Sequence, residues 1–286
     1  MLKNRTIVAS LLVPSASWLL LFFVLPMIGM TILSLRPDMQ GGPLKLGWLP
    51  TLNHYQSILA GEVYLPLLWV SVKVAFGVAL LATLLAYPLA YYLVFHAGKR
   101  ASLLLTLAIL PFWTSYLLRI IAWKTILGSN GMINNLLIYV GMVDEPVHIL
   151  LYSRPAVVVT LVYVWLPFVA LPIYAALQRI NPSLLEAAAI LGAAPWRSFF
   201  RVTLPLSLPG VIAGFFMVFI PTVGEYITPA LVGGSRGTLY GNIIELYFGD
   251  GVNWPLGSAM SIIMLIGVLL MAGIVARLFD FRKLVR

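Results

Sequence analysis

Few residues in this sequence could carry out chemistry. Residues 233–237 read Gly-Gly-Ser-Arg-Gly and match the G-x-S-x-G pattern of a nucleophilic serine. That pattern requires a preceding strand, a following helix and a nearby histidine and acid. Here it follows a long apolar run, so we interpret it as a flexible glycine-rich turn. There is no G-x-x-x-x-G-K-[ST] motif, so this chain cannot hold nucleotide phosphates by itself.

Other catalytic groups are equally sparse. The sequence has no cysteine, which excludes disulfides, thiolate metal sites and thiol nucleophiles. Its three histidines, His54, His96 and His148, fall in separate loops, which argues against a metal site. No pair of catalytic groups converges along the sequence. We therefore predict no catalytic residue, no metal and no cofactor in this chain.

Composition indicates a membrane protein. Hydrophobic residues make up 61% of the chain, charged residues 9%, and the mean hydropathy is +1.00. No polar stretch is long enough to form a soluble domain. The net charge of +9 comes without the dense basic clusters that nucleic-acid binding needs. We expect contact with membrane lipid and none with nucleic acid.

Six apolar runs are long enough to cross a bilayer. We predict an all-α polytopic membrane protein in which residues 1–286 form a single domain. The first run exceeds the roughly 7–15 residues of a signal-peptide core, so it is predicted to be an uncleaved span. Gly210 and Gly214 open the fifth run with the spacing that lets helices approach closely. The predicted spans are about 7–33, 64–95, 102–127, 155–177, 209–232 and 257–276.

Basic residues predict the orientation. Eleven of the eighteen basic residues lie at the two termini, in the turn at Lys99 or in the segment 178–208. The only acidic residues in these regions are Glu186 and Asp280, so their net charge is 11 − 2 = +9. The rest of the chain has seven basic and seven acidic residues. Basic residues that flank membrane spans stay on the cytoplasmic side. We therefore predict that both termini and the segment 178–208 are cytoplasmic. The eleven residues are Lys3, Arg5, Lys99, Arg100, Arg179, Arg197, Arg201, Arg277, Arg282, Lys283 and Arg286.

The segment 178–208 is predicted to form two short helices with a corner between them. Pro182 fits a helix start, and Ser183 with Glu186 has the spacing of a capping box. Gly192 is a natural stop because glycine tolerates a left-handed backbone. Pro195 then begins the second helix.

This segment resembles the cytoplasmic EAA loop of ATP-binding-cassette importer permeases, with Val202 where that family more often has Ile. The resemblance implies a coupling helix that docks in a groove of a separate ATPase subunit. An ordinary helical hairpin between two spans is the alternative. The positions that carry the resemblance to the coupling loop are Glu186, Ala187, Ala188, Gly192, Leu204 and Pro205.

Charged residues within the predicted spans are candidates for function because charge is costly in lipid. Lys73 and Arg119 could instead reach the interface with their long side chains. Glu225 is predicted inside the fifth span, on a polar face with Pro221, Thr222, Thr228 and Pro229. It either lines a cavity or pairs with Lys73 or Arg119. Trp113, Tyr116, Arg119 and Trp123 recur at helical spacing on the third span, as packing or as a substrate wall.

A closer resemblance, to the spermidine/putrescine importer permeases, covers most of the chain. It implies a subunit of the bacterial inner membrane that pairs with a second permease. It also implies a homodimeric ATPase that binds ATP and Mg²⁺, and a periplasmic binding protein that delivers a polyamine. Transport would then proceed by alternating access. Related branches import opines, amino-acid derivatives or phosphonates. A channel or an ion-gradient-driven transporter is the rival class, against which the coupling loop argues. The stretches that carry this resemblance are 111–119, Trp123, 130–134, 223–226, 231–234 and 253–255. The implied substrate-pathway residues are Glu225, Tyr226, Trp113, Tyr116 and Arg119.

Overall fold

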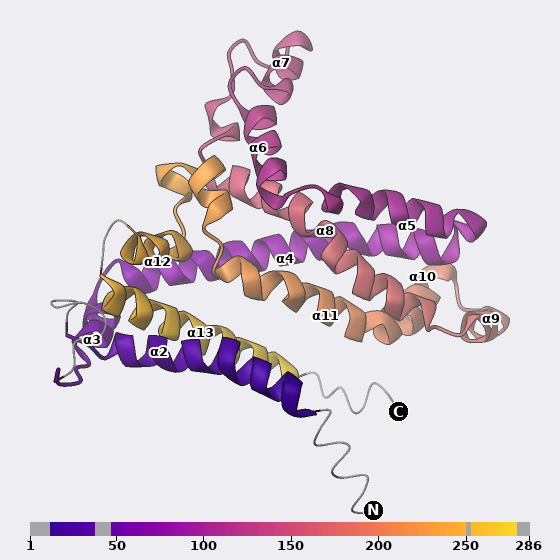
Figure 1. Ribbon diagram of the computed structural model, residues 1–286. Helices are drawn as coiled ribbons and strands as arrows, with labels where there is room; N and C mark the ends of the chain where they lie inside the picture. The colour runs from indigo at the N-terminus through magenta and orange to yellow at the C-terminus, as the bar shows by residue number, and fades with distance from the viewer. Residues whose placement is uncertain (1–11, 38–46, 250–252, 279–286) are drawn as a thin grey trace, which may run out of the picture. The chain divides into compact units, whose positions relative to one another are not determined.

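The computed structural model describes residues 12–37, 47–249 and 253–278 (Figure 1). Every regular element in these ranges is helical, which confirms the all-α prediction. Some charged residues used above to predict the orientation lie outside the described residues. They are Lys3, Arg5, Asp250, Asp280, Arg282, Lys283 and Arg286, together with Asp38 and Lys45.

Five helices of the described chain are long and apolar enough to cross a membrane. Three are continuous: α4 (Tyr64–Phe95), α8 (Arg154–Gln178) and α13 (Trp254–Leu278). The first, Leu12–Ser34, includes a π-helical turn, η1 (Leu20–Val24), and α2 (Leu25–Ser34). The remaining one is Pro195–Val223, which precedes α13 in the chain. It is made of α10 (Pro195–Ser198), the π-helical η5 (Phe199–Thr203) and α11 (Leu204–Val223). Short helices lie between them, including α3 (Asn53–Ala60), α7 (Met132–Tyr139) and α12 (Tyr240–Phe248).

The third predicted span is not one continuous helix. It consists of α5 (Ala101–Ile109), the 3₁₀ turn η3 (Leu110–Trp113) and α6 (Tyr116–Leu127), with a bend of 90° at the break. Pro111 has no N–H to donate, and Thr114 and Ser115 adopt extended backbone, which ends the first helix. Counting this bent pair as one span gives up to six. The predicted span 102–127 is therefore a sharply bent pair of helices, and Trp113 does not lie on the same helix as Tyr116, Arg119 and Trp123.

The fifth predicted span also differs. Its helix begins earlier than residue 209 and ends at Val223, followed by Gly224 and two non-helical residues. A short π-helical turn, η6 (Pro229–Gly233), then continues the chain. Glu225 therefore lies in a break between two helical segments, and the prediction that it shares one continuous helix with Thr228 and Pro229 was wrong.

The chain divides into two compact units. Unit 1 comprises Met1–Pro66 and Ile243–Gly267, and unit 2 comprises Leu67–Asn242 and Val268–Arg286. In unit 1 the Tyr64 and Tyr247 hydroxyls are 2.7 Å apart, and burial, together with this hydrogen bond, raises the pKa of Tyr247 to about 12. The single domain over residues 1–286 stays a prediction.

In unit 2, α8 and α11 lie side by side, and two glycines let them do so (Figure 1). A Cβ at Gly210 would lie 2.5 Å from both the Ala176 Cβ and the Pro172 carbonyl oxygen. A Cβ at Gly214 would lie 3.0 Å from Val169. The predicted close approach at this glycine pair is confirmed, and such contact between small residues is how membrane helices associate.

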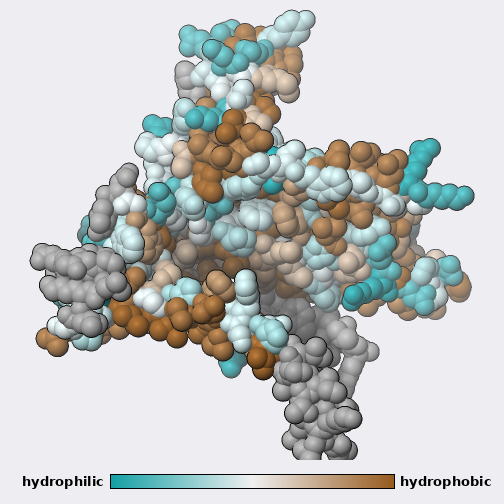
Figure 2. All heavy atoms as spheres, viewed as in Figure 1, coloured by the Kyte–Doolittle hydropathy of each residue, from teal (hydrophilic) through white to brown (hydrophobic). Residues whose placement is uncertain are grey.

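Polar residues of unit 2 gather at its ends. Figure 2 shows hydrophilic residues around α9 (Pro182–Ile190) and around α7, with hydrophobic residues along the helices between them. α8 ends and α11 begins near α9, because α9 and α10 connect them. These two helices therefore link one polar end of unit 2 to the region of the helix breaks.

Candidate functional site

The segment 178–208 folds as two short helices with a sharp corner, as predicted. α9 ends in a Schellman motif, in which the Gly192 N–H donates to the Ala189 carbonyl and the Ala193 N–H to the Ala188 carbonyl. Gly192 has φ +78°, a left-handed backbone that favours glycine. Pro195 begins α10, as predicted.

The start of α9 differs from the prediction. Asn181, not Ser183, is its N-cap, and the Asn181 side chain accepts a hydrogen bond from the Ser183 N–H at 3.1 Å. Pro182 takes the first helical position, which moves Ser183 inside the helix. The Ser183–Glu186 capping box was therefore wrong. Glu186 and Ala187 are exposed on α9, and Ala188 is half-buried.

Apolar side chains cover the corner of this loop without packing into the chain. Ile190 and Leu191 are each 86% exposed, and Trp196 is also exposed. Leu204 and Pro205 lie where η5 passes into α11, so they form the start of the membrane helix. An exposed apolar corner on a polar end of a membrane protein is a surface suited to a protein partner.

A second constellation lies where two helix breaks of unit 2 meet. The Glu225 carboxylate accepts a hydrogen bond from the Thr228 N–H at 3.0 Å and so caps the helical segment after the break. The Tyr116 and Thr228 hydroxyls are 2.9 Å apart, which ties the start of α6 to the same segment. The Arg119 guanidinium carbon lies 5.9 Å from the Tyr116 ring centroid. The structure therefore brings Tyr116, Arg119 and Glu225 together.

The first turn of α12 packs against the backbone of this break. A Cβ at Gly241 would lie 2.6 Å from the Gly224 carbonyl oxygen and 2.8 Å from that of Glu225. The Asn242 side-chain amide donates to the Tyr226 carbonyl at 2.8 Å. The backbone of Tyr226 is thus fixed, while its side chain is 43% exposed. Sequence reasoning missed Gly241 and Asn242, because only the fold places them against residues 224–226.

Arg119 has an unusual environment. Its Nε and Nη1 atoms are buried and, within the described residues, have no hydrogen-bond partner. The guanidinium carbon lies 4.5 Å from the Phe112 ring centroid and 5.9 Å from that of Tyr116. In the described part of the chain Glu225 forms no ion pair with Arg119 or Lys73, and the Lys73 ammonium lies 5.5 Å from the Trp69 ring centroid. Arg119 is therefore held by aromatic faces.

The two tryptophans of the predicted stripe have different surroundings. Trp113 precedes the 90° bend and is 80% exposed, so it shares no helix face with Tyr116 and Arg119. The ring of Trp123 packs edge-on against that of Tyr163, with centroids 5.4 Å apart. Trp113 and the Tyr116–Arg119–Glu225 cluster therefore do not share a helix face.

Two other stretches singled out in the sequence organise turns. Buried Asn134 donates to the Gly128 carbonyl at 2.9 Å and accepts from the Val147 N–H at 2.7 Å, which fixes the loop around α7. The G-x-S-x-G stretch follows the π-helical η6 and contains a 3₁₀ turn at Ser235–Gly237. No strand precedes it in the described chain, which confirms the interpretation as a glycine-rich turn.

The family of binding-protein-dependent transport system inner membrane components matches residues 4–285. This chain belongs to that family. The permease is therefore a multi-pass protein of the inner membrane and a component of a binding-protein-dependent transport system.

Curated relatives resemble the permease over most of its length. It is 37% identical over 246 residues to the spermidine/putrescine transport system permease protein PotB of Haemophilus influenzae, covering 86% of this chain and 85% of that protein. It is 36% identical over 259 residues to PotB of Escherichia coli, covering 90% of this chain and 92% of that protein.

A solved structure shares the fold. A chain of a bacterial alginate ABC transporter, crystallised with an alginate pentasaccharide-bound periplasmic protein, matches with a TM-score of 0.73 and 21% identity. The match covers 94% of the permease and 92% of that chain. It shows that the permease has the fold of an ABC importer subunit.

Proposed function

We propose that this permease is one half of the membrane pathway of an ATP-driven polyamine importer. It would pair with a second, similar permease, receive spermidine or putrescine from a periplasmic binding protein, and work with a homodimeric ATPase that binds ATP and Mg²⁺. No nucleotide would bind this chain itself.

The observation that carries this proposal is the course of α11. Its N-terminal end continues directly from the 178–208 loop, and its C-terminal end stops at Gly224, next to Glu225. Twenty residues of helix span about 30 Å, the thickness of the bilayer's hydrocarbon core. One helix thus joins the loop that would receive the ATPase's motion to the cluster that would meet the substrate.

Alternating access follows from this link. The glycine contacts pack α8 closely against α11, so we expect both helices to move with the coupling loop. Glu186, Ala187, Ala188 and Gly192 would form the docked surface. ATP binding shifts the equilibrium between inward-open and outward-open states only as far as the ATPase dimer binds one state better.

The proposed orientation places the 178–208 loop and both termini in the cytoplasm. Of the described basic residues, Lys99, Arg100, Arg179, Arg197 and Arg201 lie on this side by the course of the helices. The positive-inside rule supports this assignment. The helix breaks, α7 and the start of α8 then lie toward the periplasm.

The cationic cargo is supported by Glu225 and by the PotB relatives. A half-buried carboxylate at a break in two helices could accept an ammonium group in place of the Thr228 N–H. Tyr226 and Tyr116 would add aromatic faces, which attract ammonium groups.

A second candidate is an importer of another small solute on the same fold, such as an opine, an amino-acid derivative or a phosphonate. The observation that favours it is Arg119, whose Nε and Nη1 atoms have no hydrogen-bond partner in the described residues. A buried guanidinium in that state attracts a carboxylate or a phosphonate.

Thermal unfolding of the cognate binding protein distinguishes these cargoes. Spermidine or putrescine should raise its Tm, because a ligand that binds only the folded state stabilises that state. Opines, amino-acid derivatives and phosphonates should leave its Tm unchanged. If one of the anionic solutes raised the Tm of the binding protein and polyamines did not, the second candidate function would be favoured.

The rival class, a channel or an ion-gradient-driven transporter, predicts a chain that works without an ATPase. The exposed apolar corner formed by Ile190, Leu191 and Trp196 argues against it, since these side chains lack packing partners of their own. Purification of the permease from native membranes should recover an ATPase subunit in the same complex. Active transport by the permease purified without an ATPase would favour the rival class.

A further inference from the structure

An apolar groove of about 340 Å³ lies along the first half of α4, and it includes no residue of the coupling loop or of the Glu225 cluster. It is formed by α4, α11 and α13, and all of its lining residues belong to unit 2. Among these described residues, Lys73 is the only charged one. The lining residues are Trp69, Val72, Lys73 and Phe76 of α4, Phe219 of α11 and Met271 of α13.

Aromatic packing gives the groove a well-packed floor. The Phe76 ring lies edge-on to the Phe215 ring, with centroids 5.5 Å apart, and Phe215 stacks on Phe219 at 5.7 Å. Phe219 is 3% exposed, whereas Trp69 and Phe76 remain 58% and 51% exposed. The groove therefore has a packed floor and an open side whose exposed surface is mainly apolar.

Lys73 is unusual in this setting, because a charge on a membrane-spanning helix is costly without a partner. Within the described ranges no carboxylate forms an ion pair with it. Its ammonium lies 5.5 Å from the ring centroid of Trp69, which is one helical turn nearer to the start of α4. The side chain thus extends along the helix toward its Tyr64 end, as lysines do when they reach for the membrane interface.

The length of α4 places Lys73 near the edge of the hydrocarbon core. Thirty-two helical residues extend about 48 Å and the core is about 30 Å thick, so a centred helix projects about 9 Å at each end. Lys73 lies about 14 Å from the start of α4, and therefore about 5 Å inside the core. From there its ammonium reaches the level of the lipid headgroups while its aliphatic stem stays in the groove.

We propose that this groove binds an anionic phospholipid, with the phosphate beside Lys73 and an acyl chain along Val72, Phe76 and Phe219. A cation at headgroup level next to an apolar wall matches an amphiphile with an anionic head. Lys73 repels a polyamine, so the groove is not a cargo site. The site does not depend on the cargo, and with the proposed orientation the lipid belongs to the outer leaflet of the inner membrane.

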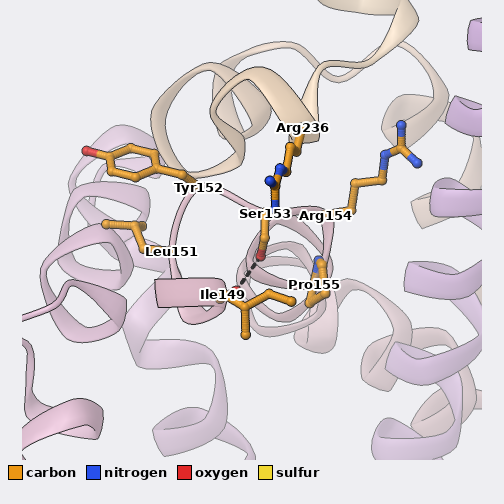
Figure 3. Close-up of a pocket in the computed structure, with 7 residues that line it drawn as sticks. All are labelled: Ile149, Leu151, Tyr152, Ser153, Arg154, Pro155 and Arg236. Atoms are coloured by element: carbon orange, nitrogen blue, oxygen red, sulfur yellow. Dashed lines mark hydrogen bonds between the residues drawn. The ribbon is translucent and has the colours of Figure 1, made fainter. Parts of the chain in front are cut away.

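A larger pocket, of about 620 Å³, at the start of α8 lacks this arrangement (Figure 3). Its two basic residues, Arg154 and Arg236, are exposed, and Figure 3 shows them extending to opposite sides. Their charges therefore do not converge on one anion. Arg154 is a matched control for Lys73, because it is a basic residue near the N-terminal end of a membrane helix and does not line the groove.

The test uses the complete transporter in nanodiscs made of equal parts of phosphatidylglycerol and phosphatidylcholine. Phe76 is replaced by the photoreactive p-benzoylphenylalanine, which crosslinks on illumination to whatever occupies the groove. Mass spectrometry then gives the ratio of the two lipids among the crosslinks. We expect phosphatidylglycerol to be enriched about fivefold, the preference that one basic residue near the membrane surface provides.

Lys73→Gln should reduce this ratio to that of the nanodisc, whereas Lys73→Arg should retain the enrichment because it keeps the charge. Arg154→Gln removes an equal charge outside the groove and should leave the ratio unchanged. The same photoreactive residue at Leu84, an exposed position of α4 that does not line the groove, should show no enrichment.

Three results would overturn the lipid site. An enrichment that persists in Lys73→Gln, or one that is equal at Leu84, would show that Lys73 and the groove do not select an anionic headgroup. Crosslinks from position 76 only to another subunit or within the chain would show that protein fills the groove. None of these results depends on transport, so each would leave the proposed function standing.

Discussion

At the scale of single residues, position 192 requires glycine because of its backbone conformation, and not because space for a side chain is lacking. Its φ of +78° is left-handed, but a Cβ there would meet no atom within 4 Å. Substitutions at Gly192 therefore separate backbone strain from crowding. A β-branched residue is disfavoured in this conformation, whereas Asn tolerates it.

We expect Gly192→Val to lose coupling and Gly192→Asn to keep most of it. Valine costs about 1–3 kcal/mol at this corner, which is enough to displace the loop. The measurement is ATPase activity stimulated by the binding protein in reconstituted complexes, with the amount of inserted permease measured in parallel. Wild-type stimulation in Gly192→Val would exclude a requirement for this corner.

Glu225 combines a structural and a proposed transport role, and two substitutions separate them. Glu225→Gln keeps an oxygen that can accept from the Thr228 N–H but removes the charge, whereas Glu225→Leu removes both. We expect Glu225→Gln to assemble and retain stimulated ATPase activity while polyamine uptake falls about tenfold or more. We expect Glu225→Leu also to lower the Tm of the complex, because a helix cap contributes about 1 kcal/mol.

Glu225→Asp is the control that retains the charge, and its uptake should lie between those of the wild type and Glu225→Gln. Full polyamine uptake by an assembled Glu225→Gln complex would remove Glu225 from the substrate pathway. Poor assembly of Glu225→Gln that is rescued by Arg119→Gln would instead indicate an ion pair.

At the scale of elements, the packing of α8 against α11 explains how a loop could act on a distant cluster. Gly210 lies so close to Ala176 and the Pro172 carbonyl that an added methyl group must push the two helices apart. Gly77, in α4, is the opposite case, since a Cβ there would meet no atom within 4 Å. The two glycines form a matched pair for one substitution.

Gly210→Ala should destabilise the permease by about 1–3 kcal/mol, the usual effect of overpacking. Gly77→Ala should be neutral or stabilise it by up to about 1 kcal/mol, because alanine favours helix. Thermal unfolding of the purified permease in detergent measures both. An unchanged Tm in Gly210→Ala would show that α8 and α11 are not packed this closely.

Hydropathy and glycine spacing predicted most of the elements, and tertiary contacts explain where they failed. α4 and α8 agree with the predicted spans within about one residue, since long apolar runs predict long helices. The breaks at 114–115 and 224–226 fall at short polar stretches, Thr-Ser and Gly-Glu-Tyr, within longer apolar runs. The break at 114–115 follows Pro111, whereas the break at 224–226 has partners distant in sequence, such as Gly241 against the carbonyl oxygens of Gly224 and Glu225.

The candidate site was predictable to a similar degree. The corner at Gly192 was predictable because a glycine just after a helix commonly ends it in a left-handed conformation, and this preference depends only on neighbouring residues. The N-cap of α9 was misassigned because Asn181 and Ser183 are both good caps, and the proline between them decides for Asn181. The proximity of Tyr116, Arg119 and Glu225 could not be predicted, because it requires two separate helix breaks to meet.

At the scale of the whole molecule, the orientation can be tested with single cysteines, because the chain has none of its own. Lys99→Cys and Arg197→Cys should resist an impermeant thiol reagent in intact cells, and Arg236→Cys and Glu145→Cys should react. Lys45 and Asp250 offer further outer positions by sequence, although they lie outside the described residues. Labelling of Lys99→Cys from outside would reverse the orientation.

The complete importer gives the most direct test of the central claim. The permease, reconstituted in proteoliposomes with its second permease and its ATPase, should take up radiolabelled spermidine only when the binding protein and ATP–Mg²⁺ are present on their respective sides. Ionophores that dissipate ion gradients should leave this uptake unchanged. Spermidine uptake that proceeds without ATP, or that stops when the ion gradient is dissipated, would contradict the account.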